Sequence, residues 1–331
     1  MAGFVRARFE LHQLRRGSPH ARADRSPVDR VPAKRGSELR RIVTLGLLTV
    51  LFVGTAPIAR AVVVTPGAII ACQRSHQLMD DPIVFPNQPG ASHLHVFFGA
   101  NATNSETTTP EAVRAEGTTC LTKADSSGYW IPAVYARGQQ LSPVTKFDAL
   151  FYYFCYFGSS VCANMQDIPQ GLRWVVGNAH AMSPAENPGL ADKTIIWKCG
   201  PGNPGRSTAQ PPAQCSTGVM VVRLRSPSCW DGVNLDSPDH KSHMAYPVGT
   251  TSSGSGGSCP ATHPVPLPRI DAFFRLNVGK SPIGEVTLSS GGWWTIHQDF
   301  FNAWSPSGLA NFMDMCINAI VDCGTNPVVP A

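Results

Sequence analysis

Histidines at residues 92–99 have a spacing that could serve proton transfer or metal binding. His93 and His95 stand two residues apart in the run SHLHVFFG. Residues two apart on a strand point to the same face, so both imidazoles can converge on one proton or one metal ion. An alternative is that the two rings only line a polar face and bond to carboxylates.

Ionisable residues are densest at residues 227–247, with the sequence PSCWDGVNLDSPDHKSHMAYP. A packed core cannot hold this many ionisable groups unpaired, so the segment forms either the rim of a site or a solvated loop. Trp230 and Tyr246 favour the rim, because sugars and other flat, hydroxylated ligands stack on aromatic rings. Candidate catalytic residues here are Asp231, Asp236, Asp239, His240 and His243, and candidate ligand-binding residues are Trp230, Asn234, Lys241 and Tyr246.

A third cluster lies at residues 291–304, in the run GGWWTIHQDFFNAW. His297 and Asp299 share a face if the chain is extended there, and the carboxylate can then fix the tautomer of the imidazole. Both residues are candidates for catalysis, and Trp294 is a candidate for ligand binding. The aromatic residues around them can equally belong to the hydrophobic core.

Histidines of the first two clusters can also form a metal site. Neutral imidazole is a common metal ligand, and two imidazoles at His-x-His spacing need no distortion of the backbone. We therefore predict a divalent metal, Zn or Cu, as a candidate cofactor, with His93, His95, His240 and His243 as its candidate ligands.

Short strands are the elements that must position these residues. Runs of β-branched and aromatic residues recur between Pro and Gly, which is typical of antiparallel β proteins. The predicted strands are residues 93–98, 129–135, 149–157, 173–176, 193–198, 220–224, 270–278 and 285–288. Helical spacing is scarce and is clearest at residues 299–320, where Pro306 and Gly308 divide it. We expect a mainly β fold, an antiparallel sandwich or barrel-like single domain over residues 62–331, with long disulfide-tied loops and one or two short C-terminal helices.

Net charge separates the amino-terminal segment from the rest of the chain. The 331 residues carry a formal charge of +5, but residues 1–61 hold 12 of the 27 basic and 4 of the 22 acidic side chains. The remaining 15 basic and 18 acidic residues give residues 62–331 a net charge of −3. Because this part lacks the positive charge that phosphate binding needs, we expect no nucleic-acid partner.

Residues 1–61 have the order of a secretory signal. A basic region ends at Arg41, an apolar run follows at residues 42–53, and Ala59-Arg60-Ala61 offers a cleavage site. The protein is therefore expected to be secreted. The alternative is an uncleaved signal anchor at residues 42–64, through which alone the chain would contact a membrane.

All ten cysteines follow residue 61, and an even number confined to the exported part indicates disulfides. No Cys-x-x-Cys pair is present to suggest a metal site. Short loops close at the lowest cost in chain entropy, which favours the pairs Cys155–Cys162 and Cys316–Cys323. Cys229–Cys259 is the next candidate, and the pairing of the other four cysteines stays open.

The stretches HLHVFFGAN, YWIPAVY, PSCWDGVNLDSPDHKSHMAYP, CPATHPVPLPRI and WTIHQDFFNAW together resemble a family of secreted actinobacterial and fungal proteins of unknown function. In fungi this family is sometimes joined to WSC-type modules, small cysteine-rich units thought to bind carbohydrate. The resemblance covers residues 76–323. It implies that the candidate residues occupy the signature segments of the family, but it assigns none of them a role. These residues are His93, His95, Asp231, Asn234, Asp236, Asp239, His240, His243, His297 and Asp299.

Three classes of function fit these observations. The first is a carbohydrate-active enzyme, a hydrolase or lyase, that acts on an extracellular or cell-wall polysaccharide through a cleft rich in His and Asp. The second is a non-catalytic module that binds carbohydrate or cell wall. The third is a surface metal-binding protein. A glycan or cell-wall polysaccharide is the expected partner in the first two classes.

Overall fold

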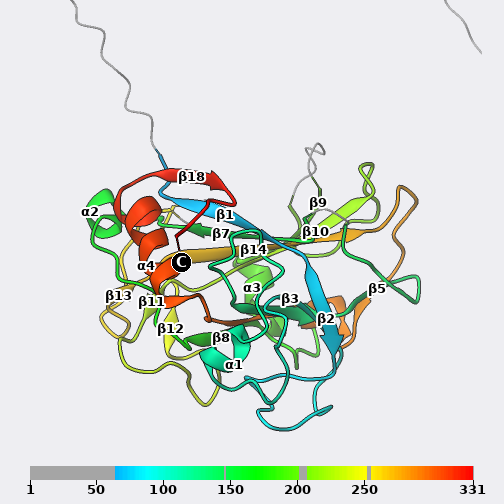
Figure 1. Ribbon diagram of the computed structural model, residues 1–331. Helices are drawn as coiled ribbons and strands as arrows, with labels where there is room; N and C mark the ends of the chain where they lie inside the picture. Colours follow the sequence, from blue (N-terminus) through cyan, green and yellow to red (C-terminus); the bar gives the residue numbers. More distant parts are fainter. Residues whose placement is uncertain (1–63, 145–146, 201–206, 252–254, 331) are drawn as a thin grey trace, which may run out of the picture. The chain divides into compact units, whose positions relative to one another are not determined.

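Strands and loops make up most of the protein in the computed structural model, which describes residues 64–144, 147–200, 207–251 and 255–330 (Figure 1). The helical elements in this part are short. They are α1 (Pro110–Arg114), α2 (Ser159–Cys162), η1 (Pro184–Glu186), α3 (Pro188–Ala191), η2 (Trp293–Thr295), α4 (Pro306–Phe312) and the single π-helical turn η3 (Met313–Asn318).

One large sheet has six strands, which lie in the upper part of Figure 1. In spatial order they are β18 (Asp322–Thr325), β1 (Gly67–Cys72), β7 (Ala149–Phe154), β14 (Arg269–Asn277), β10 (Val219–Arg225) and β9 (Ile195–Cys199). Every pair is antiparallel except β1 with β18, which is parallel. The longest strand, β14, lies near the middle, so its side chains pack on both sides.

A second sheet of five strands carries the residues of interest. Its order is β2 (Arg74–Leu78), β3 (His95–Gly99), β4 (Gly128–Pro132), β17 (His297–Phe301) and β8 (Arg173–Gly177), all antiparallel. Side chains alternate between its two faces. One face presents the apolar inner set Val96, Phe98, Tyr129, Ile131, Trp174, Val176 and Phe300.

The two sheets pack face to face through aromatic side chains. Tyr129 stacks on Phe151 with ring centroids 3.6 Å apart, and Phe98 packs against Phe274 at 5.1 Å. Each of these four residues is essentially excluded from water. Pairs of this kind each add about 0.5–1.5 kcal/mol beyond their buried area. The predicted antiparallel sandwich is therefore confirmed, and neither sheet closes into a barrel.

Two small sheets complete the β structure. One has the order β16 (Gly291–Gly292), β15 (Val286–Leu288), β5 (Val134–Ala136) and β6 (Gln139–Gln140). The other has the order β12 (Met244–Ala245), β11 (Cys229–Trp230) and β13 (Val265–Pro266). The second one anchors both ends of the motif at residues 227–247.

Each of the eight predicted strands overlaps a strand of the structure, whereas the predicted C-terminal helix starts too early. Residues 297–301 form β17, paired on both sides, and α4 begins only at Pro306. Pro at the first helical position is favourable because its missing N–H has no partner there in any case. Pro306 therefore starts the helix, and the apolar residues before it belong to a central strand.

Five disulfides join all ten cysteines. The predicted bridges Cys155–Cys162, Cys316–Cys323 and Cys229–Cys259 are confirmed. The two pairs that the sequence left open are Cys72–Cys120 and Cys199–Cys215. The bridges Cys199–Cys215 and Cys229–Cys259 each close a segment that lies partly outside the described residues, at residues 201–206 and 252–254.

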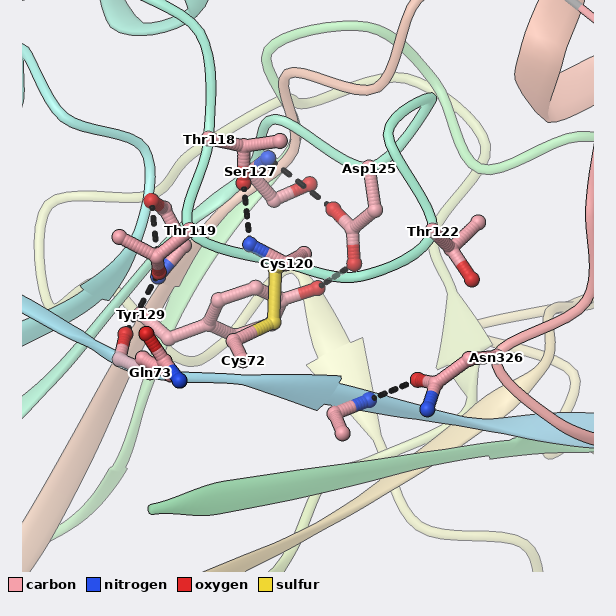
Figure 2. The surroundings of a disulfide bond; sticks show 12 residues. Cys72, Gln73, Thr118, Thr119, Cys120, Thr122, Asp125, Ser127, Tyr129 and Asn326 are labelled. Carbon is pink, nitrogen blue, oxygen red and sulfur yellow. Dashed lines mark hydrogen bonds between the residues drawn. A yellow bond between two sulfur atoms is a disulfide. The ribbon is translucent and has the colours of Figure 1, made fainter. Parts of the chain in front are cut away.

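A buried polar network lies beside the Cys72–Cys120 bridge (Figure 2). The Asp125 carboxylate accepts hydrogen bonds from the Ser127 N–H at 3.0 Å and from the Tyr129 hydroxyl at 2.6 Å. Tyr129 on β4 also shares a short hydrogen bond with Tyr153 on β7. Burial raises the pKa of Asp125 to about 6, against these hydrogen bonds. Burial in this network therefore disfavours the charged form of the Asp125 carboxyl group.

This carboxylate predicts a pH dependence of stability. A folded-state pKa near 6 against an unfolded value of 3.8 means that folding favours the protonated acid, so Asp125 destabilises the fold progressively as the pH rises from 4 to 6. Asp125→Asn lacks this effect. The free energy of unfolding of the variant relative to wild type should therefore rise by about 3 kcal/mol between pH 4 and pH 7, measured by urea denaturation. Glu106→Gln, at an exposed carboxylate, is the control, and a pH-independent difference for Asp125→Asn would contradict the prediction.

The predicted signal segment at residues 1–61 lies outside the described residues, and so does the alternative anchor apart from Val64. Among the described residues, no helix combines the length and the apolar character that a membrane span requires. Five disulfides suggest an extracellular or secreted protein.

Candidate functional site

The outer face of the five-stranded sheet brings together histidines from two distant parts of the sequence. His95 on β3 pairs with Pro132 on β4, and the register of β4 with β17 continues to His297. The two histidines therefore stand in one row, two strands apart, with the Pro132 ring between them. Backbones two strands apart are separated by about 10 Å, a distance that two imidazole side chains leaning toward each other can span.

The Nε2 atoms of three imidazoles meet above this row. His297 Nε2 lies 3.3 Å from His95 Nε2 and 3.2 Å from His93 Nε2. The Nδ1 atoms of His95 and His297 lie 2.9 and 2.8 Å from the carbonyl oxygens of Asp80 and Thr295. A carbonyl only accepts, so each Nδ1 carries the proton and each Nε2 presents a lone pair in the neutral ring. The fold thus fixes two tautomers with their lone pairs aimed at one point.

Burial keeps the three rings neutral. His95 and His297 are almost inaccessible to solvent, and His93 is half-buried. Burial, reinforced by repulsion from neighbouring histidines, lowers the pKa of His93 to about 4 and that of His297 to about 3. The same causes lower the pKa of His95 well below its ordinary value. At neutral pH this group donates electron pairs and carries no charge.

Two carboxylates adjoin the imidazoles. Asp299 Oδ2 lies 3.8 Å from His297 Nε2, and both Asp299 oxygens are buried without a hydrogen bond from any described residue. Asp81 accepts hydrogen bonds from the backbone N–H groups of Ile83 and Val84. Burial, with Asp81 nearby, raises the pKa of Asp299 well above its ordinary value, and burial raises the pKa of Asp81 to about 6. A buried, unpartnered carboxylate is costly, so Asp299 is a functional candidate.

A cavity of about 470 Å³ opens over these groups. It is lined on the side of the sheet by His93, His297, Asp299 and Asp81. Residues 238–241, which belong to the motif at residues 227–247, line it as well. That segment contributes Pro238, Asp239, His240 and Lys241. Residues from four separate stretches of chain therefore share one polar cavity, which has the size range of a small-molecule site.

Hydrogen bonds within the motif hold its side of the cavity in place. Asp239 Oδ1 accepts from Ser237 Oγ and from the N–H and hydroxyl of Ser242, and these bonds outweigh burial and hold the pKa of Asp239 well below its ordinary value. Lys241 Nζ donates to the Gly177 carbonyl at 2.6 Å. His240 Nδ1 donates to Asp236 at 2.9 Å, and this hydrogen bond raises the pKa of His240 above its ordinary value. His240 thus carries a proton more readily than His93 or His297.

Several predicted site residues lie outside the cavity. His243 is buried, with Nδ1 bonded to Ser237 Oγ and Nε2 to the Arg173 carbonyl, so neither ring nitrogen is available to a ligand. Asp231 accepts from the Asn234 N–H and side-chain amide and so closes a turn. Polar atoms of the predicted aromatic platform bond to the backbone: Trp230 to Asn234, Trp294 to Ala181 and Tyr246 to Arg225.

Two ionisable residues of the cavity were missed by the sequence predictions. Asp81 lies in the turn Asp80-Asp81-Pro82, which has no histidine at same-face spacing and looks like an ordinary turn. His180 lines the cavity at its exposed edge and is an isolated histidine in the sequence. Only the fold brings Asp81 and His180 close to the predicted histidines of the cavity, so their spacing in the sequence could not identify them.

Two overlapping groups of residues in the site could hold a metal ion. One consists of His93, His95 and His297, and the other of Asp81, His95 and Asp299; in each, one ligand atom per residue lies within 4.8 Å of the others. A third grouping of Cys72, Cys120 and Asp125 is different, because its sulfur atoms form a disulfide and offer no thiolate.

The fold and site together define a disulfide-bonded β-sandwich protein with a histidine–carboxylate cavity on the outer face of one sheet. The chain belongs to the family described as Domain of unknown function (DUF1996), which matches residues 81–304. That match begins at Asp81 and includes every residue of the cavity. No curated protein and no solved structure matches the sequence.

Proposed function

We propose that this protein is an extracellular carbohydrate-active enzyme, a hydrolase or lyase, that acts on a polysaccharide within the His/Asp cavity. The observation that carries the proposal is the convergence of His93, His240, His297, Asp299 and Lys241 on one cavity of about 470 Å³. The first and last of these residues in the sequence, His93 and Asp299, are 206 positions apart. A structural role needs no such assembly of ionisable groups, whereas cleavage of a glycosidic bond needs a proton donor and a group that accepts a proton or activates water.

The two sides of the cavity suit these two tasks. His240 has a raised pKa because Asp236 accepts its Nδ1–H, so it can donate a proton to the leaving oxygen. The sheet side holds the neutral imidazoles of His93 and His297, which donate electron pairs, and the buried Asp299. Environments that push the pKa values of neighbouring groups apart are the usual basis of an acid and a base in one site.

A polymeric substrate is supported by a second cavity next to the first. This cavity, of about 390 Å³, shares Val175, Asn178 and Lys241 with the His/Asp cavity. Tyr246 is among the residues that line it. A chain of sugar units could therefore extend from one cavity into the other, with Lys241 in contact with both parts.

The non-catalytic binding module is less well supported. A sugar platform needs an exposed aromatic face, but each of the seven tryptophans is buried or half-buried. Tyr246 is the only aromatic residue among the exposed large hydrophobic side chains of the described part of the chain.

A glycan panel tests the proposal. The chain from residue 62 is incubated with cellulose, chitin, β-1,3-glucan, alginate and peptidoglycan, with and without divalent metal ions. New reducing ends indicate a hydrolase, and unsaturated uronides indicate a lyase. Absence of product from every substrate under both conditions overturns the proposal, and binding without product favours the module.

The proton donor predicts a particular pH profile. Activity should fall as the pH rises through the pKa of His240, because the protonated imidazole is the active form. Asp236→Asn removes the carboxylate that raises this pKa, so the alkaline limb of the profile should move to lower pH while the acid limb stays in place. Asp231→Asn, in a turn of the same motif, is the matched control. An unmoved alkaline limb would exclude His240 as the donor.

A further inference from the structure

The spacing of the three Nε2 atoms matches a metal-ion coordination shell. Zn–N bonds of about 2.0–2.1 Å at a tetrahedral angle place neighbouring ligand nitrogens about 3.3 Å apart. The observed distances are 3.2 Å for His93 to His297 and 3.3 Å for His95 to His297. All three ligand atoms lie within 4.8 Å of one another, so they surround a point that an ion of this size can occupy.

A shared proton explains the arrangement less well. The Nδ1 atoms of His95 and His297 donate to backbone carbonyls, so both Nε2 atoms facing each other are acceptors in the neutral rings. Two lone pairs at 3.3 Å repel unless a cation lies between them. A single added proton could serve only one of the two contacts of His297 Nε2, whereas one metal ion satisfies all three nitrogens.

The surroundings of the imidazoles are those of metal-binding histidines. Ligating histidines usually donate their second N–H to a carbonyl or carboxylate, which fixes the ring and raises its basicity. Asp80 and Thr295 supply such carbonyls. Asp299 supplies a carboxyl oxygen 3.8 Å from His297 Nε2, buried and without a hydrogen bond among the described residues. A nearby cation would remove the cost of this unpartnered carboxylate.

We propose that His93, His95 and His297 bind one divalent transition-metal ion, Zn²⁺ or Cu²⁺, with the Asp299 carboxyl group beside them. Imidazole nitrogen selects these ions over Mg²⁺ and Ca²⁺, which require oxygen ligands. Three histidines leave a coordination position open toward the cavity, as in catalytic zinc sites. The role of the ion in catalysis rests on the proposed function, whereas its binding does not.

Metal binding is tested on the untagged chain from residue 62 after treatment with a chelator. Isothermal titration with ZnCl₂ and with CuCl₂ should show one ion per chain. His93→Gln and His297→Gln should each weaken binding by at least about 100-fold. The control is His263→Ala, a histidine outside the cavity, which should bind as wild type does. Circular dichroism confirms that each variant is folded, and His93, which is half-buried, is the ligand whose replacement least endangers folding.

A spectroscopic measurement keeps the test decisive if one variant fails to fold. The Cu²⁺-loaded wild type should show nitrogen hyperfine splitting in its electron paramagnetic resonance spectrum, and His93→Gln should reduce it. Folded wild type that binds neither ion, or binding that both glutamine variants leave unchanged, overturns the proposal. Metal binding without any glycan product refutes the proposed function alone. Product formed by fully chelated enzyme refutes the catalytic role of the ion alone and leaves its binding untouched.

Discussion

Replacing Asp299 with Asn is expected to lower the activity on the glycan substrate by at least about 100-fold while leaving the protein folded. The side chain is fully buried, lies 3.8 Å from His297 Nε2 and receives no hydrogen bond from the described residues. The substitution keeps the volume and removes the ionisable group, so it deprives the site of a carboxyl group that can exchange a proton. Because no hydrogen bond is lost, the usual cause of destabilisation at a buried polar group is absent. The measurement is kcat/KM on the substrate found in the glycan panel, together with urea denaturation.

Asp125→Asn is the matched control for this substitution. Asp125 is equally buried, but it accepts hydrogen bonds from Ser127 and Tyr129 and lies in the network beside the Cys72–Cys120 bridge. Its replacement should leave kcat/KM within a few-fold of wild type. If Asp299→Asn retains full activity, Asp299 has no catalytic part. If it unfolds the protein, its carboxylate is a structural group and the functional interpretation fails.

Spacing in the sequence could predict part of the site. The pairs His93–His95 and His297–Asp299 were predicted to share a face, and strand periodicity gave that result without knowledge of the fold. The meeting of the two pairs depends on Pro132 and β4 lying between β3 and β17. Strand order is a non-local property, since these strands are about 200 residues apart in the chain. No local pattern encodes it.

His243 shows the opposite limit. It lies three residues from His240 and was predicted as a ligand with it, but both of its ring nitrogens bond to Ser237 and Arg173. Residue type and spacing cannot distinguish a histidine that serves the motif's own structure from one that faces a cavity. His240 has a positive φ of 57° and lines the cavity, whereas His243 does not.

Strands were predictable where apolar and polar side chains alternate or where β-branched and aromatic residues are frequent, and less so elsewhere. Strands such as β10 and β14 combine β-branched or aromatic residues with turn residues at both ends. β2, with the sequence RSHQL, has a mostly half-exposed pattern and no apolar alternation, so its strand character depends on pairing with β3. β17 was assigned partly to a helix because His-Gln-Asp-Phe-Phe is compatible with both periods. Pairing with β4 and β8 decides in favour of the strand.

Removing the Cys72–Cys120 bridge is expected to destabilise the protein more than removing Cys155–Cys162. The first bridge closes a loop of 48 residues and the second a loop of 7. Restriction of the unfolded chain grows with loop length, which gives about 4 kcal/mol for the first bridge and about 2.5 kcal/mol for the second. Cys72 also lies at the end of β1, where its backbone pairs with that of Cys120 in an isolated antiparallel β-bridge. The double variants Cys72→Ala/Cys120→Ala and Cys155→Ala/Cys162→Ala are compared by urea denaturation.

Full reduction extends this prediction to the whole protein. Five bridges worth about 2–4 kcal/mol each together equal or exceed the stability of a typical domain, about 5–15 kcal/mol. The reduced chain should therefore melt far below the oxidised one, or fail to fold at 37 °C, in differential scanning calorimetry. A reduced sample that melts where the oxidised one does would mean that the sandwich core alone maintains the fold. For the single bridges, equal losses of unfolding free energy in Cys72→Ala/Cys120→Ala and Cys155→Ala/Cys162→Ala would show that strain or packing, and not loop closure, sets the contribution of each bridge.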